Sequence, residues 1–319
     1  MKKLIVLSLA TVAIMAQLSS CKKTDYNNSS TIIPAGSNNI ATLFAALRPA
    51  SQSFTVTAGT YQTITTTSGS KVSFYPNTFK DASGHIITSG TVNIQLTEAA
   101  KPGDMILNRA FPVSTDGQLL ISGGEMNLKA TMGGQPVYAN KYGVQFRQPT
   151  GSSQPMNLFI GSTGSDSSTT WTLGDTTTGT TATGTTIDST AVTNAYYTFD
   201  SCNHFNWINC DHFLGSGGTL TDVNVVFPDT SYNRTNTAAF IVFPSINSVM
   251  NVYDDGTSGG FTARNVPVGM TVKVVTLSYK SGNAYYAEQT GVVVTSGIII
   301  HPTPAVQTLT YITSALSAL

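Results

Sequence analysis

Apolar and polar residues alternate along much of the chain from about Ser51 onward. Within short runs every second residue is apolar, as at Val92, Ile94 and Leu96, and the runs are rich in β-branched and aromatic residues. Gly, Pro, Asn and Asp separate the runs, and this combination is typical of β-strands with one buried face, joined by turns. One short stretch, Ile40 to Arg48, favours a helix of about two turns. The pattern predicts an all-β fold.

The strand pattern stops over residues 161–195. These 35 residues include 14 Thr, 5 Ser and 5 Gly, and no Lys or Arg. Such a segment cannot bury enough apolar surface to offset the entropy lost on ordering it. We therefore predict a flexible Thr-rich linker between two antiparallel β-sandwich domains, at 51–160 and 196–319. In the second domain the strands recur about every ten residues, as in known sandwiches.

The first residues of the chain have the pattern of an export signal. Lys2 and Lys3 precede an apolar stretch, Leu4 to Ala16. This stretch is too short to span a bilayer, but it has the length of a signal-peptide core. Residues 1–20 are therefore predicted to be a signal peptide.

Cys21 directly follows the predicted signal peptide. Leu18-Ser19-Ser20-Cys21 resembles the bacterial lipobox, in which the Cys is lipidated and becomes the first residue of the mature chain. The alternative is an ordinary signal peptide whose next residue happens to be Cys. The polar residues that follow make 21–50 a lipidated tether.

The lipobox resemblance also implies a location. A lipoprotein has the membrane as a partner through its lipid anchor. Lys22 is not the acidic residue that retains some lipoproteins at the inner membrane, so the outer membrane is favoured. The cell surface and the periplasmic face both remain open.

Charge excludes some classes of partner. Lys and Arg total 16 and Asp and Glu total 16, so the formal net charge is zero. Nucleic-acid-binding proteins carry clustered Lys and Arg, so we predict no nucleic-acid partner. No apolar run approaches the roughly 20 residues that a membrane-spanning helix needs.

A set of positions between residues 68 and 130 resembles a domain common in surface proteins of Bacteroidetes. Its pattern is an apolar strand, Pro-x-x-Phe, an Asp…Gly turn, a Gly-x-Val-x-Ile strand ending in Glu, and a Ser-Gly-Gly-x-Met step. The matching residues are Pro76, Phe79, Asp81, Gly84, Gly90, Val92, Ile94, Glu98, Ser122, Gly123, Gly124 and Met126. The domain is similar to ZU5-type β-sandwiches, and the resemblance implies an interaction module rather than an enzyme.

The C-terminal region carries a second resemblance. FNWINCDHF and NVPVGMTVKVVTLSYKSGNAYYAEQ are similar to the C-terminal half of exported lipoproteins from the same bacteria. The Pro-Val-Gly…Val-Val strand pair resembles carboxypeptidase-regulatory or transthyretin-like sandwiches. These motifs are structural, so they imply a fold and an envelope location and carry no catalytic residue across.

Cys202 and Cys210 lie eight positions apart in the segment CNHFNWINCDH. In an exported chain the simplest arrangement is a disulfide between them that closes a small loop. Two free buried thiols are one alternative. A metal site is another, because His204, Asp211 and His212 lie nearby, although these spacings are not those of a standard zinc knuckle.

Two positions in the Thr-rich stretch are candidates for modification. Asp175-Thr176-Thr177 and Asp188-Ser189-Thr190 resemble the short O-glycosylation sequon of Bacteroidetes, with Thr176 and Ser189 as the modified residues. A chance match in a Thr-rich sequence is the alternative.

The chain carries no convincing catalytic motif. Gly256 to Gly260 matches G-x-S-x-G, but a nucleophile elbow needs a strand-to-helix turn, and Pro267 and no helix follow. We predict a glycine-rich hairpin turn there, and we expect no cofactor because the P-loop, dinucleotide-binding and HExxH motifs are absent. Trp207 is expected to anchor a core, with a ligand platform as the alternative.

The sequence as a whole predicts a non-catalytic binding or adhesion module of the cell envelope, with a glycan or protein as ligand. One alternative is a structural outer-membrane accessory protein without a small ligand. Another is a hydrolase with a dispersed site, because sandwich enzymes gather residues from distant loops.

Overall fold

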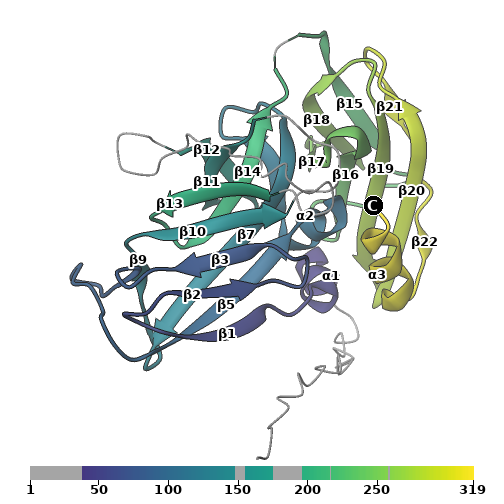
Figure 1. Cartoon of the computed structure of the whole chain (residues 1–319). Coiled ribbons are helices and arrows are strands. Elements are labelled where there is room, and N and C mark those ends of the chain that lie inside the picture. Colours follow the sequence, from purple (N-terminus) through teal and green to yellow (C-terminus); the bar gives the residue numbers. More distant parts are fainter. Residues whose placement is uncertain (1–37, 148–154, 175–195, 216, 258) are drawn as a thin grey trace, which may run out of the picture. The chain divides into compact units, whose positions relative to one another are not determined.

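Short β-strands make up most of the described chain, which comprises residues 38–147, 155–174, 196–215, 217–257 and 259–319 of the computed structural model (Figure 1). The strands form two domains, and nearly all neighbouring strands are antiparallel. The predicted all-β, two-domain fold is confirmed.

The first domain is a sandwich of two sheets. The larger sheet has, in spatial order, β1 (Gln52–Thr57), β5 (Thr91–Ala99), β7 (Leu120–Met132), β14 (Asn206–Phe213), β11 (Asn157–Thr163), β12 (Thr169–Leu173) and β6 (Ala110–Ser114), with β8 (Gln135–Pro136) paired to β7. The smaller sheet has β13 (Tyr196–Cys202), β10 (Tyr142–Arg147), β3 (Lys71–Phe74) and β2 (Gln62–Thr65). A separate two-stranded pair joins β4 (Phe79–Lys80) to β9 (Tyr138–Ala139). Of these pairings only β6–β12 is parallel.

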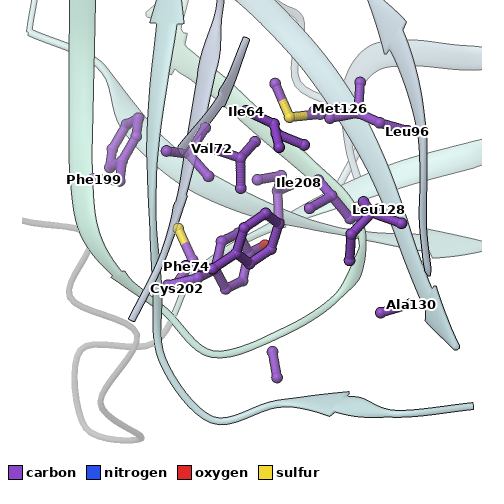
Figure 2. Packing of buried hydrophobic residues seen from close by; sticks show 14 of the residues in the cluster. Ile64, Val72, Phe74, Leu96, Met126, Leu128, Ala130, Phe199, Cys202 and Ile208 are labelled. Carbon is purple, nitrogen blue, oxygen red and sulfur yellow. The ribbon is translucent and has the colours of Figure 1, made fainter. Parts of the chain in front are cut away.

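Side chains from both sheets meet in one apolar core. On β5, Val92, Ile94 and Leu96 are buried and alternate with exposed residues. Figure 2 shows the same cluster receiving Phe74 from the smaller sheet and Ile208 from the larger one. Because every second residue of a strand faces this core, the period of two in the sequence predicts the strands correctly.

Strands β11 to β14 correct the predicted domain boundaries. The end of β11 and all of β12 lie within 161–195, and β13 and β14 lie within 196–319, yet all four pair inside the first domain. The Thr-rich stretch therefore connects two strands of one domain, and the chain enters the second domain only after Phe213 (Figure 1). Thr is β-branched and suits a pleated strand, so high Thr content did not exclude β-structure there.

The second domain is a single curled sheet of eight strands. In spatial order they are β21 (Ile299–Ile300), β15 (Leu220–Val226), β18 (Gly260–Pro267), β17 (Ser248–Asp254), β16 (Thr237–Phe243), β19 (Thr271–Lys280), β20 (Asn283–Val293) and β22 (Ala305–Val306). The pair β15–β21 is parallel. A 3-10 turn, η2 (Pro244–Ile246), connects β16 to β17.

Both faces of β16 are buried, which explains its continuous apolar run. Ile241 and Phe243 belong to the cluster inside the curled sheet, whereas Phe240 and Val242 belong to a cluster on its other face. That second cluster also takes in residues of the three helices, α1 (Ile40–Leu47), α2 (Pro102–Asn108) and α3 (Leu309–Ser317).

Helix α1 confirms the helix predicted from the sequence and corrects the predicted tether, which extended to residue 50. The side chain of Asn39 caps α1 by accepting a hydrogen bond from the Ala41 backbone N–H (2.8 Å), and Leu43 and Phe44 are buried. The sequence pattern does not predict α2 or α3. Both are short enough that only two turns of apolar spacing are present, and tertiary packing stabilises such helices.

Several predicted features lie outside the described residues. They are the signal peptide, the lipidation site Cys21 and the candidate glycosylation sites Thr176 and Ser189. Within the described part of the chain, no helix combines the length and the apolar character needed to cross a membrane.

Candidate functional site

A cleft extends from the outer face of the larger sheet, the face turned away from the first-domain core, to α1 and strands β16 to β18 of the second domain. It consists of two pockets, of about 610 and 540 Å³, that share Arg48 and Ser167 as lining residues. The smaller, which we call the sheet pocket, is lined by Arg48, Ser51, Gln95, Thr97, Asn108, Asn127, Lys129, Gly161, Thr163, Ser167, Thr169, Asn206 and Trp207. The larger, which we call the arginine pocket, is lined by Ile40, Ala41, Phe44, Ala45, Arg48, Arg109, Asp166, Ser167, Arg234, Thr237, Ala238, Asn251, Val252, Tyr253, Asp254 and Phe261.

Trp207 and Gly161 form the floor of the sheet pocket. In one row across the sheet Thr97 pairs with Asn127, which pairs with Trp207. Trp207 is 9% exposed and meets Trp171 edge to face, with ring centroids 6.2 Å apart. A Cβ on Gly161 would lie 2.5 Å from the Trp207 Cβ, so only glycine fits there. Trp207 is thus the predicted core anchor, and it also lines the pocket.

Polar side chains stand along both sides of this floor. Gln95 and Lys129 are exposed and lie opposite one another on β5 and β7. The side-chain oxygen of Asn127 is buried and has no hydrogen-bond partner among the described residues. Amide, hydroxyl and ammonium groups together can donate to and accept from a ligand that is rich in hydroxyl groups.

Two arginines meet where the pockets join. Arg48 Nε donates a hydrogen bond to the Leu107 carbonyl oxygen (3.1 Å). The Arg109 guanidinium lies 5.5 Å from the centroid of the Phe44 ring, and its Nη2 lies 3.8 Å from Asp166 Oδ2. Burial lowers the pKa of Arg109, against the opposing effect of Asp166. Arginine nevertheless stays protonated in proteins, so the junction carries positive charge.

Three residues that line the cleft have a left-handed backbone. They are Arg109 (φ 53°), Ser167 (φ 65°) and Asn206 (φ 76°), and they are half of the six non-glycine residues with positive φ in the described chain. Such conformations cost on the order of 1–3 kcal/mol and persist where the surrounding structure holds them, often at ligand sites. Their concentration supports this cleft as the functional site.

Two carboxyl groups are buried on the same sheet face, further along the strands. Glu125 pairs with Asn209, and neither Glu125 oxygen has a hydrogen-bond partner among the residues that the structure describes. Asp211 accepts a hydrogen bond from Asn209 Nδ2 (2.5 Å) and keeps one oxygen without a partner. Asn247, next to η2, donates to the Ser122 carbonyl oxygen (3.2 Å) on the same strand as Glu125.

Burial raises the pKa of both carboxyl groups well above the ordinary range, and the nearby Asp211 raises that of Glu125 further. Both side chains are fully buried, and neither lines the two pockets of the cleft. A substrate in the cleft would therefore not touch this carboxyl pair.

The structure corrects the predicted disulfide. Cys202 and Cys210 are free thiols, both buried in the first-domain core; Figure 2 shows Cys202 there. Between them the chain passes from the smaller sheet to the larger one, because Cys202 pairs with Tyr142 and Cys210 with Leu158. Short spacing in sequence therefore does not mean that a small loop is closed. The alternative of two free buried thiols is the one observed.

Cys202 and Cys210 are expected to react with iodoacetamide slowly in the folded protein and readily in the unfolded protein. Burial raises the pKa of both Cys202 and Cys210, so each stays a protonated thiol that reacts slowly in the native protein. In denaturant without reductant, peptide mapping by mass spectrometry should find both labelled. If both are labelled only after a reductant is added, they form a disulfide.

The remaining sequence predictions have simpler outcomes. Among the described residues no group of three or more His, Cys, Asp or Glu side chains could hold a metal ion. Gly256 to Gly260 connects the antiparallel strands β17 and β18, so the predicted turn is confirmed, while Ser258 lies outside the described residues.

Sequence reasoning predicted Trp207 as a core anchor, with a ligand platform as the alternative, and missed the arginines of the cleft. Arg48 follows a short helix and Arg109 ends another, and neither lies in a motif. The one local signal at Arg109 is its position between a short helix and a buried strand, where a left-handed residue ends the helix. The two arginines meet only through tertiary packing.

Comparisons with known proteins leave the family open. No protein-family model matches the chain, and no curated protein is significantly similar to it.

Proposed function

We propose that this chain is a non-catalytic binding module of the bacterial cell envelope, held at the membrane by a lipid on Cys21, and that its cleft binds a glycan. The observation that carries the proposal is the sheet pocket, a polar hollow with Trp207 in its floor and amide and hydroxyl groups around it. Binding, rather than catalysis, is the chemistry that these groups support.

The position of the pocket on a sheet favours a rigid site. Thr97, Asn127 and Trp207 come from three neighbouring hydrogen-bonded strands, so the backbone fixes their spacing before a ligand arrives. Preorganised hydrogen-bonding groups lose little conformational entropy on binding. A sugar ring offers apolar C–H groups to the part of Trp207 that lines the pocket and hydroxyl groups to the amides beside it.

The carboxylates that line the cleft support a non-catalytic role. Asp166 Oδ1 accepts hydrogen bonds from the Ser168 N–H (3.0 Å) and Ser168 Oγ (2.7 Å). Asp254 accepts from the backbone N–H of Gly256 (2.8 Å) and of Arg234 (3.0 Å). Each carboxylate is thus engaged by hydrogen bonds within the fold. Burial raises the pKa of Asp166, but the hydrogen bonds from Ser168 outweigh it and lower the pKa overall, which is unsuited to a general acid.

Binding to an immobilised panel of oligosaccharides tests the function. We expect Gln95→Ala and Lys129→Ala to weaken binding, each by about fivefold, the value of one hydrogen bond. Asn93→Ala is the matched control, because Asn93 is exposed on the same strand as Gln95 and does not line the pocket. Absence of binding to every oligosaccharide, or equal loss in the control, would contradict the proposal.

Two cell experiments test the proposed location. Cys21→Ala should move the protein from the membrane fraction to the soluble fraction, and retention in the membrane would exclude the lipid anchor.

Protease treatment of intact cells should remove the protein if it faces outward, and protection until the outer membrane is opened would place it in the periplasm.

A further inference from the structure

The arginine pocket holds an unusual share of the positive charge of this chain. The sequence contains five arginines, and three of them, Arg48, Arg109 and Arg234, line this pocket. Lys129 adds a fourth cation in the adjoining sheet pocket. Against these four stand two carboxylates, Asp166 and Asp254, so the cleft has an excess of two positive charges in a chain of zero net charge.

The two carboxylates do not satisfy the guanidinium groups. Both are engaged in the hydrogen bonds of their own turns, as described above. The distance of 3.8 Å between Arg109 Nη2 and Asp166 Oδ2 is too long for a hydrogen bond. In addition Arg109 Nε is buried and has no hydrogen-bond partner in the part of the chain that the structure describes. A buried donor without an acceptor is unfavourable, so an anion beside it would be stabilised.

The arginines are held in place before any ligand arrives. The contact with the Phe44 ring and the left-handed backbone fix Arg109, and the hydrogen bond to Leu107 orients Arg48. Arg48 lines both pockets, and Arg109, in the arginine pocket, lies close enough to Arg48 for the two charges to act on one another. A planar guanidinium fixed in this way matches the two oxygens of a carboxylate or sulfate.

We infer that the glycan bound in the cleft is acidic, with a carboxylate or sulfate group held by Arg48 and Arg109 while its neutral sugar units lie over Trp207. This inference rests on the proposed function and narrows its ligand. A uronic acid and a sulfated sugar supply the same anionic chemistry, and the test separates them.

The test uses the mature chain and a panel of matched oligosaccharides. The panel holds oligogalacturonides with free carboxylates, the same chains as methyl esters, and dextran oligomers with and without sulfate. We expect at least one acidic chain to bind, its neutral counterpart to bind at least about tenfold more weakly, and its affinity to fall as salt is raised. The acidic chain that binds identifies the anion as carboxylate or sulfate.

Arginine variants then test whether the anionic group of the glycan is bound by Arg48. Arg48 is exposed, so Arg48→Gln should fold normally and weaken acidic-chain binding by at least about tenfold. Arg48→Lys keeps the charge but loses the planar fork, and should give a smaller loss. Arg147→Gln is the matched control, because Arg147 is exposed and lines neither pocket.

The outcomes separate the inference from the proposed function. Equal binding of acidic and neutral chains, or equal effects of Arg48→Gln and Arg147→Gln, would overturn the inference and leave glycan binding in place. Failure of every chain to bind would overturn both. Selective binding of an acidic chain that depends on Arg48 supports both.

Discussion

Glu125→Gln should make the protein more stable at pH 8, by on the order of 1–3 kcal/mol in the free energy of unfolding. The Glu125 carboxyl group is fully buried, and neither of its oxygens has a hydrogen-bond partner within the described ranges of the chain. Asp211 lies close enough to disfavour its charge. Glutamine has nearly the same shape and cannot ionise, so the substitution removes the penalty of burying a charge. Urea denaturation at several pH values measures the effect.

The stability gained by Glu125→Gln should increase with pH, because the folded and unfolded states of the wild-type protein bind different numbers of protons. Burial raises the pKa of Glu125 in the folded protein, whereas in the unfolded chain the carboxyl group ionises near its ordinary pKa of about 4.3. Above that pH the unfolded chain binds fewer protons than the folded protein, so wild-type stability falls as pH rises toward the raised pKa. The difference between Glu125→Gln and wild type should therefore be near zero below about pH 4, and should increase by up to about 1.4 kcal/mol per pH unit above it.

Glu288→Gln is the matched control for this prediction. Glu288 lies on β20, is partly exposed and has an oxygen 3.2 Å from Lys273 Nζ. Because Glu288 is paired with Lys273, its substitution removes an ion pair and does not remove an unpaired buried charge. No increase in the free energy of unfolding is therefore expected at any pH. Asp211→Asn should give a smaller gain than Glu125→Gln, because burial raises the pKa of Asp211 but hydrogen bonds from Ser122, Asn209 and Gly123 partly offset this effect. A loss of stability at pH 8 in both Glu125→Gln and Asp211→Asn would mean that the two carboxylates have a counter-charge in the fold.

Trp171→Ala should destabilise the protein by about 3–5 kcal/mol. Trp171 is fully buried, packs edge to face on Trp207 and donates a hydrogen bond from Nε1 to the Phe111 carbonyl oxygen (2.8 Å). Truncation leaves a large cavity and an unpaired carbonyl oxygen beneath the sheet pocket. Urea denaturation followed by circular dichroism measures the loss.

Leu173→Ala is the control from the same strand. Leu173 is 45% exposed, so its substitution should change stability by less than about 1 kcal/mol. The comparison also tests the corrected domain boundary, since a linker residue could be replaced at little cost. A loss below about 1 kcal/mol for Trp171→Ala would show that residues 169–173 do not pack in the first domain.

The interior of the first domain illustrates what local pattern can and cannot predict. The alternation at Val92, Ile94 and Leu96 predicts a strand because it depends only on neighbours in sequence. The same rule does not assign β14 to the first domain, since its partners Glu125 to Leu128 on β7 lie about 80 residues earlier in the chain. The alternation of apolar and polar residues within a strand does not specify which strand lies beside it in the sheet.

The candidate site shows the same division. The sequence by itself determined the all-β class, the short helix at Ile40 and the burial of Trp207, because periodicity, composition and residue size report local preferences. Only the tertiary structure decided that Arg48, Arg109 and Trp207 border one cleft, that Glu125 lies near Asp211, and that Cys202 and Cys210 stay unpaired. These juxtapositions join residues from separate strands and helices, and their physical origin is the packing of sheet faces, to which residues distant in sequence contribute together.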